Sequence, residues 1–222
     1  MKSIGILGGM GPEATVELYM RLVQAFQARG AVYDEDFPSI YIYNFPAPNI
    51  VERENEILSL LVDGLEKLQE MGSEILAIPC NTATCIIDKN ENIPGFVSIV
   101  KETVKKVKEY NYKKVGLLST KLTLKTEIYQ SLLKKEGIEL VLPTEMEIKE
   151  ITKIILNILS GKKLPSDKSS LEKIALGMIK KGADAIILGC TELPLIFTNS
   201  SIRTVDTIQV LTEALIREAF RR

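Results

Sequence analysis

The sequence predicts an α/β fold of two pseudo-symmetric lobes, each a mostly parallel sheet flanked by helices, with a ligand-binding site in the cleft between them. Short segments rich in β-branched residues alternate with longer helical segments, which is the pattern of parallel βαβ units. The order of elements in the first half of the chain then repeats in the second half. Matching positions keep a nearly constant offset, 111 residues from Gly5 to Gly116 and 110 residues from Gly72 to Gly182.

The first half begins with a short apolar strand, which leads through a Gly-rich turn to Pro12, a residue suited to the first position of a helix. A second long helix ends at Gly72, as helices commonly do at a glycine. The expected strands cover residues 3–7, 39–43, 74–78 and 96–99. The expected helices cover residues 12–29 and 51–71, and a Lys- and Glu-rich helix ends near residue 110.

The second half follows the same order. Short runs of apolar and β-branched residues predict strands at residues 114–118, 138–142, 183–188 and 202–205. Helices are expected at residues 120–136, 144–159 and 169–181, and a last helix runs to the end of the chain. A segment of turn-forming residues, 160–167, separates two of these helices.

Two cysteines occupy equivalent places in the two halves. Cys80 and Cys190 are 110 residues apart, each follows a predicted strand, and each stands eight residues after a glycine that ends a helix. Ligands of open parallel sheets bind beyond the carboxyl ends of the strands. Two related lobes that face each other would therefore bring both thiols to one cleft, where we expect the active site. The counterpart of Cys85 is Leu195, so Cys85 is expected to pack in a core.

The composition excludes several classes of function. The formal net charge of −1 provides no basic field for nucleic acid or for an anionic membrane. No apolar run approaches the roughly 20 residues needed to span a bilayer, and glycines interrupt the N-terminus before a signal peptide could form. We therefore expect a cytoplasmic protein with a small-molecule partner, with no nucleic acid and no membrane, and with its cysteines as reduced thiols.

The chain contains no histidine. Histidine is the commonest transition-metal ligand and the commonest general base, so its absence restricts both kinds of chemistry. Zinc held by cysteine alone needs paired Cys-x₂-Cys spacings, and Cys80, Cys85 and Cys190 provide none. We expect neither a metal nor another cofactor, and proton chemistry must fall to Cys, Asp, Glu, Lys or Tyr.

Polar residues follow both thiols at the expected start of a helix. Asn81 and Thr82 follow Cys80, and Thr191 follows Cys190. Backbone N–H groups at a helix start stabilise a thiolate or hold a substrate carboxylate. A single buried cysteine after a strand is usually just a small apolar residue, but the matched pair favours chemistry.

A thiol on each side of a substrate suits the inversion of a carbon centre. One group removes the α-proton of an amino acid from one face, the other returns a proton to the opposite face, and the roles exchange with direction. A thiolate and a thiol can do this without a cofactor if the site stabilises the carbanion and excludes water. Glu192 is either an assistant to proton transfer at Cys190 or a surface or capping carboxylate.

The Gly-rich turn has two interpretations. Its Gly9-x-Gly11-x-x-Ala14 spacing formally fits the dinucleotide fingerprint, but that fingerprint also needs an acidic residue at the end of the second strand, and residues 41–45 contain none. A phosphate-binding P-loop is excluded because no Gly-Lys-Ser/Thr follows. We therefore expect the turn to bring backbone amides and Met10 close to a small anionic ligand.

With these residues in place, the chain resembles the aspartate/glutamate racemase superfamily, the pyridoxal-phosphate-independent amino-acid racemases, and within it the aspartate racemase branch. The matching segments lie in family order over essentially the whole chain, at residues 5–15, 79–83, 116–120 and 188–194. The resemblance implies two α/β lobes, a homodimer, and Cys80 and Cys190 as the catalytic acid and base.

The resemblance also implies roles in substrate binding and a division of the chain. The α-carboxylate and amino group of the substrate are expected at Asn81, Thr82, Thr120 and Thr191. Arg53 stands where the family has a carboxylate-binding arginine. Because the last helix of such proteins tends to return to the first lobe, we place one lobe at residues 1–98 with residues 207–222, and the other at residues 99–206.

Two departures from the family concern the substrate. Aspartate racemases usually read Cys-Asn-Thr-Ala-His where this chain has Thr84. They also tend to carry a lysine just before the glycine of a turn, whereas residues 158–161 here read Ile-Leu-Ser-Gly, with Lys162 and Lys163 after them. The leading hypothesis is therefore a cofactor-independent racemase or epimerase of an amino acid or a related carboxylate, with the substrate open.

Two alternatives keep the same scaffold. One is an isomerase or decarboxylase of a small dicarboxylate, such as a maleate or malonate derivative. Decarboxylation needs only one proton donor, so the presence of both cysteine loops favours racemisation. The other is a small-ligand binding or regulatory protein without catalytic activity. The absence of the family histidine at Thr84 and of the family lysine before Gly161 suggests this alternative.

Overall fold

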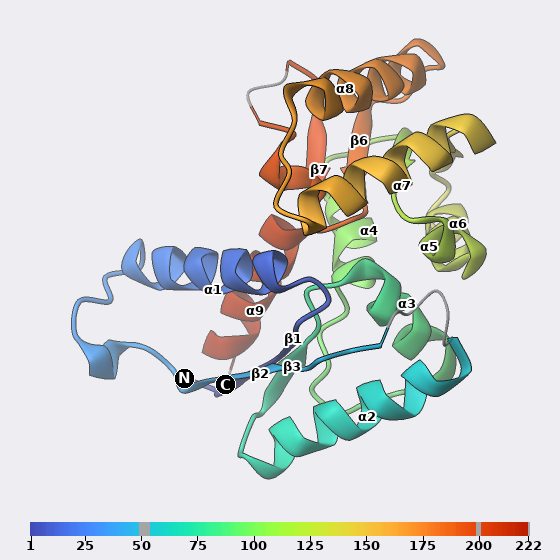
Figure 1. The fold of residues 1–222 in the computed structure, drawn as a ribbon. Coiled ribbons are helices and arrows are strands. Elements are labelled where there is room, and N and C mark those ends of the chain that lie inside the picture. Colours follow the sequence, from blue (N-terminus) through green and yellow to red (C-terminus); the bar gives the residue numbers. More distant parts are fainter. Residues whose placement is uncertain (49–53, 199–200, 222) are drawn as a thin grey trace. The chain divides into compact units, whose positions relative to one another are not determined.

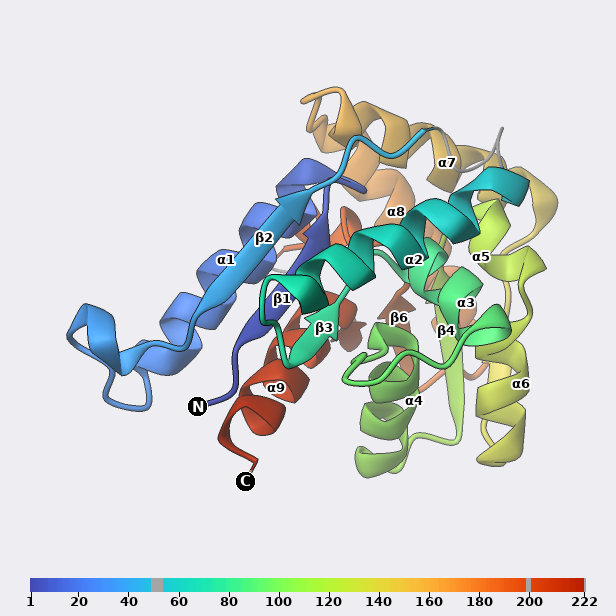
Figure 2. The same cartoon turned by 90° about the horizontal axis from the view of Figure 1, so that it is seen from below.

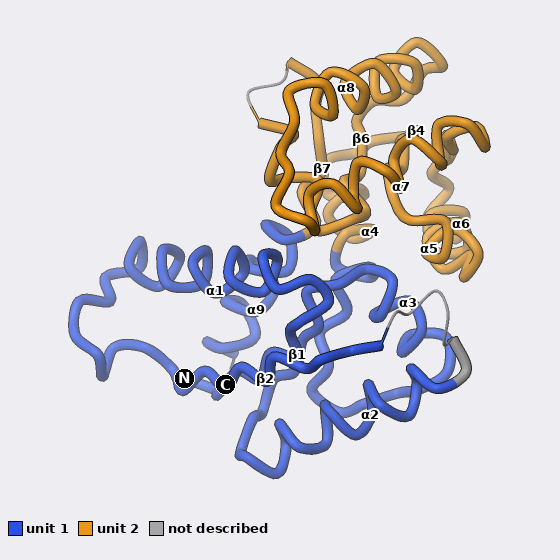
Figure 3. The backbone as a smooth tube through the Cα atoms, viewed as in Figure 1, with its two compact units in different colours: residues 1–102, 208–222 blue, residues 103–207 orange. Residues whose placement is uncertain are grey.

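The computed structural model describes residues 1–48, 54–198 and 201–221. Within this part of the chain the residues form two compact units, coloured separately in Figure 3. Unit 1 comprises residues 1–102 and 208–222, and unit 2 comprises residues 103–207. The chain therefore passes from one unit to the other inside helix α4 (Ile99–Glu109) and at the start of helix α9 (Thr207–Phe220).

Unit 1 is built on a parallel sheet, whose described strands have the order β2–β1–β3. The central strand β1 (Ile4–Gly8) pairs in parallel with β2 (Ile40–Asn44) and with β3 (Ile75–Ala77). All residues of β1 are buried, as expected of a central parallel strand. Because the strands run in the same direction, the segments that follow them lie at one edge of the sheet (Figure 2).

The strand expected at residues 96–99 is wrong, because the structure has only an isolated bridge there. Phe96 alone forms a parallel bridge with Leu76. Helix α4 already begins within this range, because the Ser98 hydroxyl accepts a hydrogen bond from the Lys101 N–H (3.1 Å) and so caps the helix. A capping serine starts the helix where the apolar sequence alone predicts a strand.

The helices of unit 1 include the last helix of the chain. In addition to the first turn of α4, they are α1 (Pro12–Gln27), α2 (Glu54–Glu70), α3 (Asn81–Asn90) and α9 (Figure 1). The ring centroids of Phe26 on α1 and Phe220 on α9 lie 6.0 Å apart. The Lys2 N–H, just before β1, donates to the Ala219 carbonyl (3.0 Å). The C-terminal helix therefore packs on the N-terminal elements.

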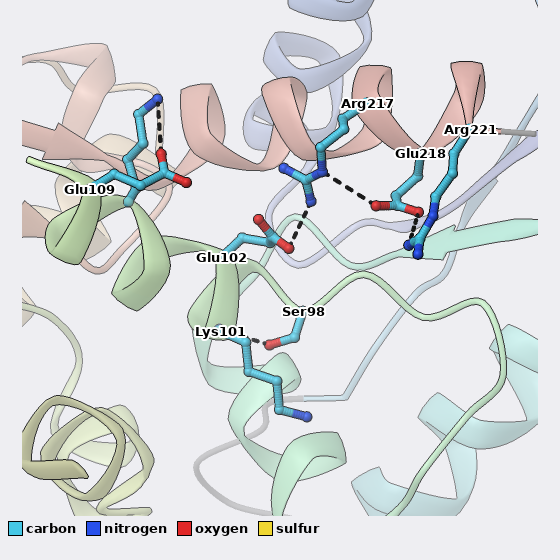
Figure 4. Close-up of polar contacts among 8 residues, drawn as sticks. Ser98, Lys101, Glu102, Glu109, Arg217, Glu218 and Arg221 are labelled. Atoms are coloured by element: carbon cyan, nitrogen blue, oxygen red, sulfur yellow. Dashed lines mark hydrogen bonds and ion pairs between the residues drawn. The ribbon is translucent and has the colours of Figure 1, made fainter. Parts of the chain in front are cut away.

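Charged side chains also connect α9 with the start of α4. The Arg217 guanidinium donates to the Glu102 carboxylate (Nη2–Oε1, 2.8 Å) and lies 3.3 Å from Glu218 on its own helix (Figure 4). Such a partly exposed ion pair contributes at most about 1 kcal/mol. The buried apolar residues of α9, among them Leu211 and Leu215, contribute more to its attachment.

Unit 2 repeats the same plan with a parallel sheet, whose described strands have the order β5–β4–β6–β7. The strands are β4 (Lys114–Leu118), β5 (Glu139–Val141), β6 (Ala185–Leu188) and β7 (Thr204–Asp206). The helices are α5 (Lys121–Lys125), α6 (Ile128–Lys135), α7 (Glu145–Leu159) and α8 (Pro165–Lys180). One hydrophobic cluster joins α7, α8 and β6 with residues 190–197. No helix in the described part of either unit is long and apolar enough to cross a membrane.

Two helices of unit 2 differ from the prediction. The helix expected at residues 120–136 is divided into α5 and α6, because Glu127 adopts a left-handed conformation (φ +57°) that a continuous helix cannot accommodate. Helix α8 starts at Pro165 instead of residue 169, since proline is well suited to the first helical position. The Asp167 carboxylate in this first turn is buried and accepts a hydrogen bond from Asn157 of α7 (2.9 Å).

The two units share a detail that reflects the internal repeat. In unit 1 the Glu74 carboxylate accepts a hydrogen bond from the Ser3 N–H (3.0 Å), just before β1. In unit 2 the Asp184 carboxylate accepts hydrogen bonds from the N–H groups of Lys113 (2.7 Å) and Lys114 (3.0 Å), where β4 begins. Each carboxylate stands two residues after the glycine that ends a helix, so the 110-residue offset extends to equivalent contacts.

Asp184→Asn is expected to make unit 2 less stable near neutral pH. The Lys114 and Lys113 N–H groups lower the pKa of the Asp184 carboxyl below its ordinary value. A lowered pKa stabilises the folded state above the pKa of the unfolded chain, and this contribution is lost as the pH falls through the folded-state pKa. Because Asp184 is exposed, screening limits the expected decrease in Tm at pH 7 to about 2 °C.

Thermal unfolding from pH 7 down to pH 3 checks this expectation. The difference in Tm between the wild type and Asp184→Asn should shrink as the pH falls. Asp63→Asn, which removes an exposed carboxylate from α2, is the control for loss of charge. A difference that stays constant over the whole range, or that grows at low pH, would contradict the assignment.

Candidate active site

In unit 1, the segments after β1, β2 and β3 meet at the carboxyl edge of the sheet. Met10 follows β1, Phe45 follows β2 and Cys80 follows β3, and all three side chains pack against the same hydrophobic cluster. That cluster includes Leu7 and Ile78, which lie at the ends of the strand segments. The structure thus brings the predicted residues Met10 and Cys80 to one edge, where ligands of parallel sheets bind.

Cys80 is the residue immediately before α3, as the sequence predicts. Its backbone is extended, its N–H donates to the Ile78 carbonyl (2.8 Å), and its own carbonyl accepts from the Thr84 N–H (3.0 Å). The half-buried thiol therefore belongs to the N-terminal turn of a ten-residue helix. Asn81 and Thr82, predicted to bind substrate, are the first two residues of that helix and are buried. The N-terminus of a helix favours negative charge on a thiol or on a bound carboxylate.

The Gly-rich turn is held by a buried threonine that the sequence reasoning missed. Gly9 has φ +94°, and a Cβ there would collide with the Phe45 carbonyl oxygen. The Gly9 N–H donates to the Thr15 hydroxyl (3.0 Å), and that hydroxyl donates to the Gly11 carbonyl (3.2 Å). The Gly9 amide is thus used within the turn, which fixes the backbone around Met10. The only hint in the sequence was a threonine in the first turns of a helix that follows glycines.

In unit 2, Thr120 and Cys190 follow the neighbouring strands β4 and β6. Thr120 caps α5, because its hydroxyl oxygen accepts a hydrogen bond from the Thr123 N–H (3.2 Å). The Gly189 N–H donates to the Leu118 carbonyl (2.8 Å), which extends the pairing of the two strands up to Cys190. Both predicted residues therefore lie at the carboxyl edge of the unit 2 sheet.

The Cys190 thiol makes a direct contact with Glu192. Its Sγ donates a hydrogen bond to Glu192 Oε2 at 2.8 Å, and the Thr191 hydroxyl donates to the same oxygen at 3.4 Å. Glu192 is only 4% exposed and Cys190 only 7% exposed. The interpretation of Glu192 as a surface carboxylate is therefore wrong. A buried carboxylate needs such donors to compensate for its lost hydration.

The helix expected directly after Cys190 is not formed. A single 3-10 turn, Leu193–Leu195, follows instead, and the Leu193 N–H donates to the Cys190 carbonyl (3.1 Å). Leu193 and Phe197 are buried in the core of unit 2, so this segment packs into the core instead of continuing as a helix. The two thiols thus have different surroundings, a helix start at Cys80 and a buried carboxylate at Cys190.

Three predicted positions remain, namely Arg53, Thr84 and Cys85. Arg53 lies outside the described residues, and its role in binding a carboxylate stays a prediction. Thr84, at the position of the family histidine, is fully buried, and its hydroxyl donates to the Ile78 carbonyl (3.4 Å). Cys85 is fully buried in the core, as predicted, and all three cysteines are thiols. Among the described residues, no group of three or more Cys, Asp or Glu side chains is arranged to hold a metal ion.

Gly189→Ala is expected to displace the turn that carries Cys190. An added Cβ would lie 2.6 Å from Leu117 Cδ1 and 3.2 Å from the Leu118 carbonyl oxygen. The expected cost in unfolding free energy is about 1–3 kcal/mol, and the displaced thiol should lower kcat about 10-fold. Gly177→Ala is the matched control, since a Cβ on that helical glycine meets nothing within 4 Å and should stabilise α8. Equal kcat values for the two variants would contradict this expectation.

A family model described as Asp/Glu/Hydantoin racemase matches residues 7–215, nearly the whole chain. The fold and the two cysteine loops agree with this match, and the chain belongs to the Asp/Glu/Hydantoin racemase family. It is thus a racemase, and racemases are a class of isomerase. The resemblance drawn from the sequence motifs is confirmed.

Individual relatives agree with the family. The broad specificity amino-acid racemase RacX of Bacillus subtilis (strain 168) is 29% identical over 225 residues, which cover 96% of this chain and 96% of the relative. The structure of an aspartate racemase from Picrophilus torridus has a TM-score of 0.84 and 28% identity, and covers 100% of this chain and 96% of that one. An aspartate racemase homologue from Pyrococcus horikoshii OT3 has a TM-score of 0.81 and 27% identity, with 100% of both chains covered. The predicted two-lobe α/β fold is confirmed by these structures.

Proposed function

We propose that the chain is a cofactor-independent amino-acid racemase or epimerase in which Cys80 and Cys190 act on opposite faces of the substrate α-carbon. The observation that carries this proposal is the hydrogen bond of 2.8 Å from the Cys190 thiol to the buried Glu192 carboxylate. Because the Cys190 thiol donates this hydrogen bond, we assign Cys190 as the acid of this state.

Cys80 is the natural partner base. It occupies the equivalent position of unit 1, at the start of α3, where the backbone N–H groups favour the thiolate. The Cys80 thiolate removes the α-proton, the electron pair of the broken C–H bond stays on the α-carbon, and Cys190 donates its proton to the opposite face. After this turnover Cys80 is the thiol and Cys190 the thiolate, which is the state that catalyses the reverse direction. Proton exchange with solvent restores the first state.

Glu192 assists at Cys190. While Cys190 is a thiol, the carboxylate orients its proton, and the 2.8 Å separation places Glu192 within reach of that proton when Cys190 must lose it. The Thr191 hydroxyl donates to the same oxygen of the Glu192 carboxylate, so it helps to hold that carboxylate in place beside Cys190. This arrangement accounts for the burial of an acidic residue beside an apolar core.

The proposed substrate is a small free amino acid. We assign its α-carboxylate and amino group to the carboxyl edges of the two sheets, at Asn81, Thr82, Thr120 and Thr191. Met10 contributes an apolar wall, and Arg53 is proposed to contact a carboxylate. Thr84 donates to the backbone of unit 1 and supplies no imidazole for an aspartate side chain. The range of substrates is therefore expected to resemble that of a broad specificity racemase more than that of a strict aspartate racemase.

We further propose that the enzyme acts as a homodimer, on the basis of the family resemblance. Sedimentation equilibrium at several protein concentrations tests this assembly. A single species with twice the mass of the chain is expected, and a monomer at every concentration would contradict it.

The experiment that tests the proposed reaction is proton NMR of a panel of L- and D-amino acids incubated with the reduced protein in D₂O. Loss of the α-proton signal from one or several amino acids, together with appearance of the opposite enantiomer, is the expected result. The Cys80→Ala/Cys190→Ala double variant is the control for non-enzymatic exchange. No exchange across the whole panel from folded protein would contradict the proposal. Turnover of maleate or malonate derivatives in a parallel assay would then favour the dicarboxylate alternative.

A further inference from the structure

We infer that Thr207 is a positioning residue for Cys190. The Thr207 hydroxyl donates a hydrogen bond to the Leu188 carbonyl oxygen at 2.9 Å, and Thr207 is 0% exposed. Leu188 is the last residue of β6 and precedes Cys190 by two residues. This inference rests on the role proposed above for Cys190, because a positioning residue matters only if the thiol it positions takes part in the reaction.

The contact lies just beyond the regular sheet. The parallel register of β6 and β7 ends at the pair Leu188 and Asp206, and Thr207 is the next residue along the chain. Its hydroxyl therefore continues the attachment of β7 to β6 by one step after the strand pairing has ended. On the other side of β6, the Gly189 N–H donates to the Leu118 carbonyl of β4 (2.8 Å). The backbone that leads into Cys190 is thus held from both neighbouring strands.

The backbone after Cys190 is held more locally. The Cys190 carbonyl accepts from the Leu193 N–H (3.1 Å), and the thiol donates to Glu192 within the same turn. These contacts move with the turn if the turn moves, whereas the bonds at Leu188 and Gly189 anchor it to the sheet. If the Thr207 hydroxyl is removed, the Leu188 carbonyl loses a buried hydrogen-bond donor. The turn can then shift so that this carbonyl meets another donor. A shift of the turn displaces the Cys190 sulfur directly.

Two replacements of Thr207 separate the hydroxyl from the shape of the side chain. Thr207→Val keeps the branched shape and removes the hydroxyl, whereas Thr207→Ser keeps the hydroxyl. Thr212→Val is the matched control. Thr212 lies on the same helix, is 2% exposed, and donates its hydroxyl to the Ile208 carbonyl (2.8 Å) within that helix. Both valine variants therefore lose a buried hydroxyl of α9, but only one loses a bond to the strand before Cys190.

The deciding measurement is the rate at which iodoacetamide alkylates Cys190 relative to Cys80 in the full-length folded protein, quantified by mass spectrometry of the peptides. A loosened turn exposes the thiol and weakens its contact with Glu192, so we expect Thr207→Val to raise the ratio of the Cys190 rate to the Cys80 rate at least threefold. Thr207→Ser and Thr212→Val should stay close to the wild-type ratio. In the racemase assay, Thr207→Val should lower kcat about 10-fold with KM nearly unchanged, and Thr207→Ser should restore it.

The outcomes are distinguishable. A Thr207→Val variant with the native circular dichroism spectrum and the same alkylation ratio as Thr212→Val would overturn the inference. A ratio that decreases would overturn it as well. If the wild-type protein racemises no amino acid, the proposed function fails, but the alkylation ratio still decides whether Thr207 positions the Cys190 turn.

Discussion

Replacing Cys190 by serine is expected to reduce racemisation at least about 10³-fold while one enantiomer continues to exchange its α-proton with solvent. A serine hydroxyl is a much weaker acid than a thiol, so the second proton transfer fails. The Cys80 thiolate can still remove the α-proton from its own face and return a solvent proton to the same face. Chiral chromatography measures the inversion, and proton NMR in D₂O measures the exchange of each enantiomer separately.

Cys80→Ser is the complementary variant. It should lose racemisation to a similar extent but retain exchange of the opposite enantiomer, because Cys190 serves the other face. Cys85→Ala is the control, since Cys85 is fully buried in the core of unit 1 and has no proposed role in the chemistry. Its activity should stay within about twofold of the wild type, with a lower Tm from the lost packing. Near-normal racemisation by either serine variant would contradict the two-thiol mechanism.

Glu192→Gln is expected to lower kcat about 100-fold, the second largest effect. The amide has the same shape as the carboxylate but carries no negative charge and cannot take up a proton from Cys190. The substitution thus leaves the packing of the turn nearly unchanged and removes the function proposed for the 2.8 Å contact. Measurement of kcat and KM separates the two effects, and KM is expected to change little.

The control for Glu192→Gln is Glu172→Gln. Glu172 lies on α8 of the same unit, 4.0 Å from Lys168, and is partly exposed. Removal of its charge should leave kcat within about twofold of the wild type, as partly exposed ion pairs contribute little. If Glu192→Gln is as active as Glu172→Gln, the Glu192 carboxylate is structural and the assistance proposed for it is wrong.

Most strands and helices could be predicted because local sequence determines them. Residues 114–118 coincide with β4, since the apolar run at residues 115–118 is typical of a buried central strand in a parallel sheet. The errors arose where one residue overrides a local pattern. The left-handed Glu127 divides one predicted helix, and the Ser98 cap begins another where a strand was expected. Neither effect has a clear signal in hydrophobic periodicity.

The candidate site was predicted in part. The equal spacing of Cys80 and Cys190 followed from the internal repeat, and the parallel sheets place each thiol at a carboxyl edge. The burial of Glu192 could not be predicted, because a glutamate after a strand is as common on the surface, and only the tertiary packing of residues 190–197 encloses it. The Thr207 hydroxyl contact depends on a partner in another segment and has no local signature, whereas the Thr15 contacts lie within the adjacent turn and were indicated only by a threonine that follows its glycines.

The most direct test of the two-thiol account is the isotope content of substrate and product in the first few per cent of the reaction in D₂O, starting from a single protonated enantiomer. If one thiol removes the proton and a different thiol donates to the opposite face, the product should carry deuterium at the α-carbon while the remaining substrate keeps its proton. Mass spectrometry after chiral separation provides both values. Equal deuterium in both enantiomers at early times, or a product that retains the original proton, would contradict the account.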